Sequence, residues 1–421
     1  MDFEDVPTYG NTMNRSSRGR FLDPSTPPHL VTLVLLAGLS ALAMNVFLPS
    51  LPQMTAYFDT EYRLMQLSVA IYLGVNAALQ ILIGPISDKL GRRPVILWGV
   101  ALFMLATLGC IFATDVWVFL LFRMCQAVIV TAMVLSRAVV RDMVGQDEAA
   151  SMIAYVTMGV AVVPMVGPVI GGALGEVLGW KAIFWMLFAL GGAVLWLSWR
   201  DLGETSTASS LSLAAQFREY PELLKSPRFW GYAMACALSS GAFFSYLGGA
   251  PFVGSEVFGL SPASLGVHFG APAVGYFLGN WISGKFSARV GLNRMILWGS
   301  LILTCGLSAA LITFALTGGS ALIFFGFMCF VGLGNGMTIP NATAGTLSVR
   351  PHLAGTASGL GGAIMIGGGA ALSALAGALL RPGTGAWPLL WLMLATAVGA
   401  VISILLVIRR ERRLGGLDAA E

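Results

Sequence analysis

The chain has 421 residues, of which 57% are hydrophobic and 10% are charged, and its mean hydropathy is +0.80. Ordinary soluble domains carry about 25% charged residues, so this composition excludes a water-soluble fold. The formal net charge is +4, and the positions of the basic residues, described below, explain it without a nucleic-acid partner.

Twelve apolar stretches have about the 20 residues that a helix needs to cross the hydrocarbon core of a bilayer. Lipid offers no hydrogen-bond partners to the backbone, and barrel strands would show shorter, alternating segments. The sequence therefore predicts an all-α membrane protein with twelve transmembrane helices. The stretches lie at 30–52, 64–84, 94–113, 116–140, 150–175, 181–199, 229–251, 263–284, 294–316, 319–340, 353–380 and 385–408.

A polar segment divides these stretches into two sets of six. We interpret it as a cytoplasmic linker between two six-helix halves. The N-terminal tail lacks the apolar core and cleavage site of a secretory signal peptide, so the first span is expected to act as the insertion signal. The predicted parts are an N-terminal tail at 1–28, halves at 29–200 and 229–408, the linker at 201–228, and a C-terminal tail at 409–421.

A weak internal repeat supports this division. The sequence Ile-Ser-Asp-Lys at 86–89, followed by Ile-Leu-Trp-Gly at 96–99, recurs as Ile-Ser-Gly-Lys at 282–285, followed by Ile-Leu-Trp-Gly at 296–299. Both copies lie between the second and third spans of their half. Parallel six-helix repeats of this kind allow two halves to rock about a central site.

Lys and Arg are concentrated on one side of the predicted bundle. That side holds the loop at 89–93, the linker and the terminal cluster at 409–413, whereas the opposite loops hold only Arg63, Lys181 and Arg381. Since cytoplasmic loops carry the excess of basic residues, both termini are predicted to be cytoplasmic. Anionic lipid headgroups are the expected neighbours of the basic side.

No pattern typical of metal, redox or nucleotide chemistry is present. The five cysteines lie within apolar stretches and form no CxxC pair, and the three histidines are dispersed. A phosphate-binding GxxxxGKS or GxxxxGKT loop is also absent from the sequence. We therefore predict no enzyme activity, no metal site and no cofactor.

The loop between the second and third spans carries the most specific local pattern. Gly84, Asp88 and Gly91 are spaced through it, and Arg92 and Arg93 follow. This loop resembles the signature loop of the major facilitator superfamily, which implies that family's fold of twelve helices in two halves. An ordinary positive-inside loop is the alternative, but it explains only the basic residues and not the spacing of the others.

The resemblance implies a conformational latch on the cytoplasmic side. In the family, the acid at the position of Asp88 faces the N-terminus of a helix in the other half, and the arginine at the position of Arg92 pairs with an acid after the fourth span. Asp142 is the matching acid in this chain. Both interactions are strained apart when the halves tilt, as a latch requires.

A run of glycines and prolines in the fifth span resembles the motif of the antiporter branches of the same superfamily. Because proline removes a backbone hydrogen bond, the motif predicts a bend in the helix. Close packing of small residues is the alternative. The residues are Gly159, Pro164, Gly167, Pro168, Gly171 and Gly172.

Five short blocks in both halves resemble one subfamily, the Bcr/CflA multidrug efflux proteins. The resemblance implies antibiotic resistance through export of small amphipathic or drug-like molecules, bicyclomycin and chloramphenicol included, in exchange for protons across a bacterial inner membrane. The blocks lie at 45–52, 121–126, 137–142, 250–253 and 258–262.

The first span departs from that subfamily at Asn45, where an aspartate is usual. An amide cannot take up or release a proton near neutral pH. All Asp and Glu residues of the chain fall in tails, loops or end turns of the predicted spans. Proton antiport therefore lacks its usual carrier, and coupling through Asp59 or Glu61 near the outer mouth stays open.

Arg123 is the only charged residue deep within a predicted span. A charge there is unfavourable unless it faces a cavity or a partner, so Arg123 is the first candidate for a substrate or coupling residue. Residues at helical spacing on the adjoining faces complete a predicted central cavity. These are Gln126 on the fourth span, Tyr72, Asn76 and Gln80 on the second, and Asn45 on the first. The alternative for the amides is hydrogen bonding that holds the helices together.

The function predicted from these features is secondary active efflux by alternating access, with a small-molecule substrate, a lipid bilayer around the protein and a monomeric state. Whether protons are also transported is left open. A facilitator or uptake symporter on the same fold is one alternative. A membrane sensor or scaffold that does not transport is the other, although a latch has little use in a static protein.

Overall fold

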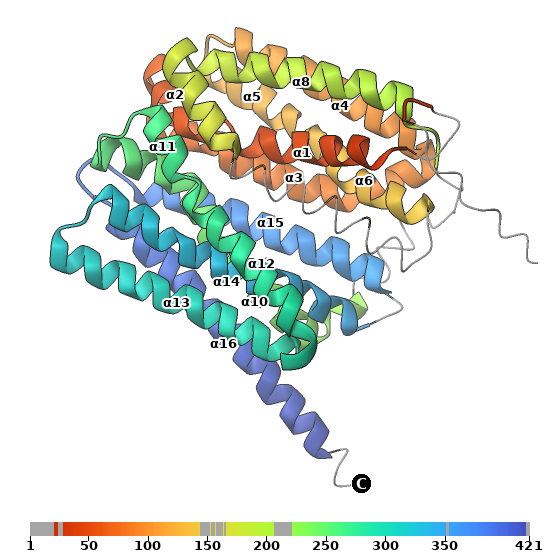
Figure 1. The fold of residues 1–421 in the computed structure, drawn as a ribbon, viewed down its shortest axis with the longest axis vertical. Coiled ribbons are helices and arrows are strands. Elements are labelled where there is room, and N and C mark those ends of the chain that lie inside the picture. Colours follow the sequence, from red (N-terminus) through yellow and green to blue (C-terminus); the bar gives the residue numbers. More distant parts are fainter. Residues whose placement is uncertain are drawn as a thin grey trace, which may run out of the picture.

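The computed structural model describes residues 21–23, 28–143, 152, 156, 163, 166–205, 221–350 and 353–417. Its described elements are helices, arranged as two adjacent bundles (Figure 1). The first bundle contains α1 (Leu30–Asn45), α2 (Leu51–Tyr57), α3 (Tyr62–Leu90), α4 (Arg92–Phe112), α5 (Val116–Gln126), α6 (Val130–Met143), the helical segment Val166–Leu178, and α8 (Trp180–Asp201).

The second bundle follows the linker. It contains α10 (Pro227–Phe252), α11 (Pro262–His268), α12 (Ala271–Val290), α13 (Leu292–Thr317), α14 (Ala321–Ser348), α15 (Ala354–Leu379) and α16 (Trp387–Leu417). Within the described ranges, 10 helices are long and apolar enough to cross a membrane, and Val166–Leu178 is a shorter apolar helix. The predicted all-α membrane class is confirmed, while half of the predicted fifth span at 150–175 lies outside the described residues.

Helix ends differ from the predicted spans for local reasons. The first span bends after α1 through a short 3-10 turn, Leu48–Ser50, into α2, and both elements begin with a proline in their first turn. Proline cannot donate the backbone hydrogen bond that would continue a helix, so it favours such a start. The last helix instead continues past 408 to Leu417, so the first residues of the predicted C-terminal tail are helical.

The internal repeat is also a structural repeat. Gly91 between α3 and α4 has φ of 92° and ψ of 151°, and Gly291 between α12 and α13 has φ of 90° and ψ of 150°. Residues with a side chain rarely adopt this conformation, so glycine permits the same abrupt turn in both halves.

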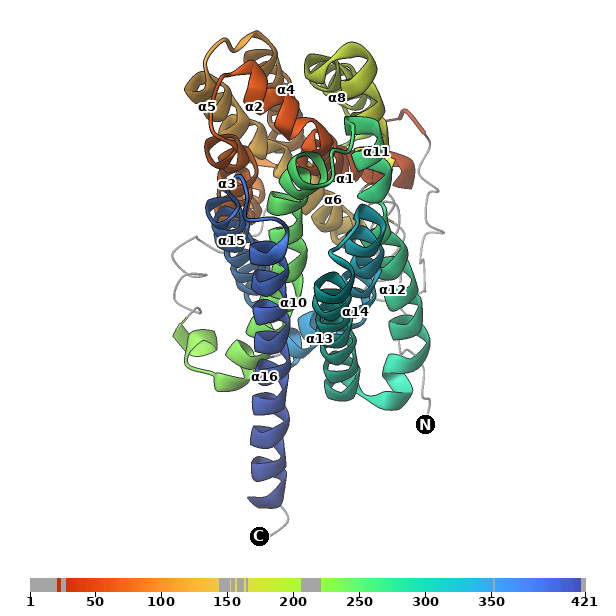
Figure 2. The same cartoon turned by 90° about the vertical axis from the view of Figure 1, so that its left-hand side faces the viewer.

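The two halves touch along α3 and α15, which lie side by side (Figures 1 and 2). At the end that carries α2 and α11, hydrogen bonds between described residues cross the interface. Tyr62 Oη donates to Gly248 O at 2.9 Å, Gln66 Nε2 donates to Ser373 O at 2.6 Å, and Ala263 N donates to Glu176 Oε2 at 2.9 Å. The halves are therefore joined at this end of the bundle.

Candidate functional site

Arg123 lies on α5 and its side chain is 1% exposed. Nη2 donates to the carbonyl oxygen of Ala43 on α1 at 2.9 Å, and Nη1 donates to Gln126 Oε1 at 2.7 Å. The donors thus fix the guanidinium between the first and fourth spans of the first half.

Two aromatic rings provide the remaining stabilisation of this cation. The guanidinium carbon lies 4.3 Å from the ring centre of Phe47 and 4.0 Å from that of Tyr72. A desolvated cation–π contact contributes about 2 kcal/mol. Arg123 is therefore held by carbonyl, amide and ring partners, and none of these contacts is a carboxylate.

Gln126 connects the guanidinium to α4. Its Nε2 donates to Thr107 Oγ1 at 2.8 Å, and that hydroxyl donates to the carbonyl oxygen of Phe103 at 2.7 Å. Because each donor in this chain has one acceptor, the Gln126 oxygen is directed toward Arg123. The polar groups are thus positioned by three separate helices.

Three buried polar atoms on the predicted site residues have no hydrogen-bond partner among the described residues. They are Arg123 Nε, the Tyr72 hydroxyl and Asn45 Oδ1. Asn45 uses its amide nitrogen to bond Ala41 O at 3.0 Å, which leaves the oxygen available. An unpaired buried polar group costs about 1–3 kcal/mol, so a bound molecule that pairs with such atoms is favoured.

The structure separates the candidates on the second span. Tyr72 reaches Arg123, whereas Gln80 Nε2 donates to Asn76 Oδ1 at 2.8 Å, one turn away along α3. A Cβ at Gly362 on α15 would lie 3.3 Å from Gln80 Oε1, so Gln80 faces the other half. Asn76 and Gln80 therefore belong to the interface between the halves, beside the Arg123 cluster.

The latch residues form a network within the first half. Arg92 Nη1 lies 2.6 Å from Asp88 Oδ1, and Arg92 Nε lies 3.0 Å from Asp142 Oδ2. Arg92 also donates to Ser87 Oγ. The ion pairs of Arg92 therefore connect α3 and α4 to the end of α6. The contact of Asp88 with the other half stays a prediction.

Sequence reasoning missed one member of this network, Glu204. Its carboxylate accepts the backbone N–H groups of Arg92 at 2.8 Å and Arg93 at 3.3 Å, which are the first of α4. A carboxylate at a helix N-terminus is stabilised by the helix dipole. A side chain on Gly91 would collide with Glu204, so this glycine is required by both its φ and its neighbour, whereas a Cβ on Gly84 would meet nothing within 4 Å.

The fifth-span motif is described only in part, because Gly159 and Pro164 lie outside the described residues. Gly171 leaves no room for a Cβ against the carbonyl of Val46, and Gly172 leaves none against the carbonyl of Pro262 in the other half. The packing against Gly167 is less tight, and the carbonyl oxygen of Pro168 leaves no room for a Cβ at Gly266. These residues make close packing contacts on both sides, and the predicted bend stays a prediction.

Other residues that sequence analysis missed are Phe47 and Thr107. Phe47 is two residues after Asn45, and only the turn after α1 brings its ring to Arg123. Thr107 is a hydroxyl in an apolar helix, where such groups commonly bond their own backbone. The sequence signal for Thr107 is that it is a polar residue in the helix next to Gln126. Whether the two side chains meet depends on how α4 and α5 pack.

Comparison with known proteins places these features in context. The family model described as Major Facilitator Superfamily matches residues 33–374. The chain is 31% identical to a chloramphenicol resistance protein of Pseudomonas aeruginosa, over 86% of each chain. It is 27% identical to a bicyclomycin resistance protein homolog of Haemophilus influenzae, over 93% of this chain and 99% of the relative.

The fold is also similar to that of solved structures. A bacterial homolog of the human lysosomal transporter Spinster, crystallised in an inward-facing and occupied conformation, superimposes with a TM-score of 0.70 at 19% identity. The match covers 91% of this chain and 96% of that one.

Proposed function

Because this chain belongs to the major facilitator superfamily, as its signature loop predicts, we propose that it exports small amphipathic or drug-like molecules by alternating access. The relatives named for chloramphenicol and bicyclomycin resistance support export of this substrate class. The bacterial source of these relatives and the distribution of basic residues support an inner-membrane location with both termini in the cytoplasm. The proposed functional unit is the monomer.

The Arg123 cluster carries the proposal. It combines a buried cation, two aromatic rings and three unpaired polar atoms in one half of the protein. An amphipathic substrate can stack on the rings and offer an acceptor to Arg123 Nε and a donor to Asn45 Oδ1. Since small-molecule sites typically combine apolar and aromatic side chains with a few placed polar groups, the cluster suits a drug-like ligand better than a charged metabolite.

The contacts between the halves support alternating access. In the proposed orientation, Tyr62, Gln66 and Glu176 lie at the outer ends of their helices, so their bonds to the second half hold the outer side closed. The Arg92 network lies at the inner end and connects residues of the first half. Release of substrate to the outside requires the three outer contacts to break.

One observation favours a facilitator on the same fold as the second candidate. The described carboxylate that is fully buried, Asp201, lies at the end of α8 and accepts hydrogen bonds from Leu22 N, His29 N and Thr32 Oγ1 at 2.7, 2.8 and 2.6 Å. These three hydrogen bonds hold α1 against α8. Asp201 therefore has a structural role, and Asn45 offers no carboxyl group in the first span.

Transport of chloramphenicol into proteoliposomes, with and without an imposed pH gradient, tests both candidates. Accumulation above the external concentration only when the gradient is present would establish coupled export. Equilibration that ignores the gradient would establish a facilitator. Flux equal to that of protein-free liposomes, repeated for bicyclomycin, would contradict the proposed substrate class.

A further inference from the structure

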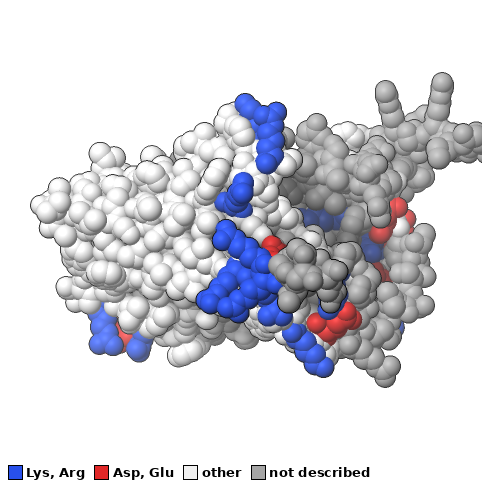
Figure 3. Space-filling model, turned by 90° about the horizontal axis from the view of Figure 1, so that it is seen from below, with Lys and Arg blue, Asp and Glu red and all other residues white. Residues whose placement is uncertain are grey.

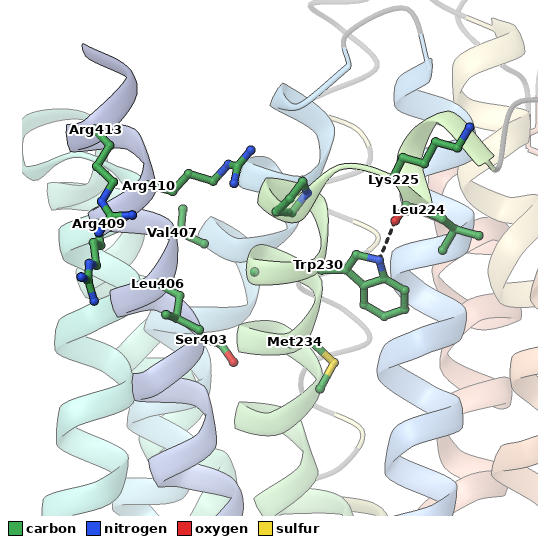
Figure 4. A pocket seen from close by; sticks show the side chains of 12 residues that line it. Leu224, Lys225, Trp230, Met234, Ser403, Leu406, Val407, Arg409, Arg410 and Arg413 are labelled. Carbon is green, nitrogen blue, oxygen red and sulfur yellow. Dashed lines mark hydrogen bonds between the residues drawn. The ribbon is translucent and has the colours of Figure 1, made fainter. Parts of the chain in front are cut away.

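A groove of about 860 Å³ opens between α10 and α16, away from the Arg123 cluster. Figure 4 shows that its lining changes character along its length. Apolar side chains, among them Met234 and Leu406, line one end, and basic side chains surround the other. The basic rim consists of Lys225, Arg409, Arg410 and Arg413.

The floor and one wall of the groove are rigidly built. A Cβ on Gly231 would collide with Val407 Cγ2, so α10 and α16 touch closely beneath the groove. The indole Nε1 of Trp230 donates to the carbonyl oxygen of Leu224 at 2.8 Å (Figure 4). This bond holds a large amphipathic ring at one wall, the position that tryptophan prefers at a membrane–water interface.

The three arginines of the basic rim stand on the part of α16 that extends beyond the other helices (Figure 2). Glu411, the acid within this basic run, is turned to the opposite side. Its carboxylate accepts from Arg228 Nη2 at 2.7 Å and from Asn293 Nδ2. These bonds anchor the extension to α10 and α13, and they pair the Glu411 carboxylate with Arg228 and not with the rim.

The rim belongs to a wider positive surface. Seen from the side on which α16 ends, Lys and Arg side chains gather next to a broad uncharged surface (Figure 3). In the proposed orientation this boundary lies at the headgroups of the cytoplasmic leaflet. Basic pockets between transmembrane helices at that level bind anionic headgroups, and each nearby Lys or Arg contributes about 1 kcal/mol.

We propose that this groove binds one anionic phospholipid of the cytoplasmic leaflet. The phosphate contacts Arg409, Arg410 and Lys225, and an acyl chain lies along Trp230 and Leu406. A soluble anion would use the rim alone and leave the apolar end uncovered. The proposal rests on the membrane orientation given above, and it requires neither drug transport nor proton coupling.

The test is native mass spectrometry of the purified full-length chain, titrated with dioleoylphosphatidylglycerol or dioleoylphosphatidylcholine. One phosphatidylglycerol is expected to bind more tightly than phosphatidylcholine with the same acyl chains. Replacing Arg409, Arg410 and Arg413 together by Gln should weaken its binding about fivefold per arginine, or about 100-fold in all. Arg412→Gln is the matched control, because Arg412 is exposed on the same helix but does not line the groove.

A second variant tests the apolar end without changing charge. Ser403→Trp places a large ring in the groove and should displace the lipid while all four basic side chains remain. Equal binding of the two lipids, equal loss in Arg412→Gln, or retention of lipid in Ser403→Trp would each overturn the proposal. Displacement of the lipid by millimolar inorganic phosphate would overturn it in favour of a soluble anion. None of these readouts involves drug flux, so their failure is distinguishable from failure of the efflux proposal.

Discussion

The guanidinium carbon of Arg123 lies 4.0 Å from the centre of the Tyr72 ring, and this contact joins the second and fourth spans of the first half. The Tyr72 ring covers a face of the guanidinium, and the Nη atoms at its edge donate hydrogen bonds to Ala43 and Gln126. A buried charge without these partners would be strongly unfavourable. The pair therefore explains how a permanent positive charge persists inside an apolar helix bundle.

Arg123→Gln is expected to abolish drug export and leave membrane insertion intact. The amide is neutral and cannot reach Ala43, Gln126 and the two rings together. Drug tolerance of cells that lack other pumps, compared at equal amounts of membrane protein, measures the effect. Arg63→Gln, at an exposed outer position, is the control and should keep full tolerance. Tolerance retained by Arg123→Gln would remove Arg123 from the transport mechanism.

Tyr72 offers a finer test because its ring and its hydroxyl have different roles. Tyr72→Phe keeps the ring against Arg123 and removes only the hydroxyl that has no partner, so the thermal unfolding midpoint should stay unchanged while drug affinity falls. Tyr72→Leu removes the cation–π contact as well and should destabilise the protein by about 2 kcal/mol. Thermal unfolding and drug binding of the two purified variants separate these effects. Equal drug affinity of Tyr72→Phe and wild type would exclude a substrate contact by the hydroxyl.

The Arg92 network should govern the rate of cycling and leave substrate affinity unaffected. Asp142→Asn removes the charge opposite Arg92 Nε at 3.0 Å, and Asp88→Asn removes the one opposite Nη1 at 2.6 Å. A loss of about 1.4 kcal/mol in the rate-limiting step would slow turnover about tenfold. Initial rates over a range of drug concentrations in proteoliposomes measure kcat and KM separately. Glu256→Gln, an exposed acid at the opposite end, provides the control. An unchanged kcat in both latch variants would mean that the loop only sets the membrane topology.

Features that depend on residues close together in the sequence could be predicted, whereas contacts between distant helices could not. The helices, the loop from Gly84 to Arg93 and the burial of Arg123 depend on apolar runs and short spacings, which one chain displays directly. The partners of Arg123 depend on helix packing, because Ala43 contributes a backbone carbonyl that no sequence pattern marks. Glu204 is similar, since a single acid in a polar linker becomes the cap of α4 only in three dimensions.

Asn45→Asp should create a proton-dependent step that the native amide lacks. The carboxyl group can exchange a proton. Position 45 lies in the last turn of α1 together with Ala43, whose carbonyl oxygen accepts a hydrogen bond from Arg123. An imposed pH gradient should therefore raise drug flux through Asn45→Asp by a larger factor than through wild type. Asn45→Leu controls for loss of the amide. An equal gradient response in all three proteins would place any proton coupling elsewhere.

The outer closure rests on a bond that can be weakened from either side. Gln66 Nε2 donates to both the carbonyl and the hydroxyl oxygen of Ser373, at 2.6 and 2.8 Å, and both residues are fully buried. Gln66→Leu removes the donor and leaves the buried acceptors unpaired, which costs about 1–3 kcal/mol in the closed state. Gly377→Val acts from the other half, because even a Cβ there would lie 2.6 Å from Gln66 Oε1.

Both variants should shift the population toward the state that is open to the outside. Spin labels at Ala56 on α2 and Ser261 beside α11, in a background with Cys125 and Cys305 replaced by Ser, report this opening as a longer distance. Gly326→Ala is the matched control, since its Cβ would meet nothing within 4 Å. Because a ligand or mutation shifts a conformational equilibrium only by its differential effect on the two states, drug export should slow in the variants even if the drug still binds. A distance distribution identical to that of wild type in both variants would show that Gln66 does not hold the outer end closed.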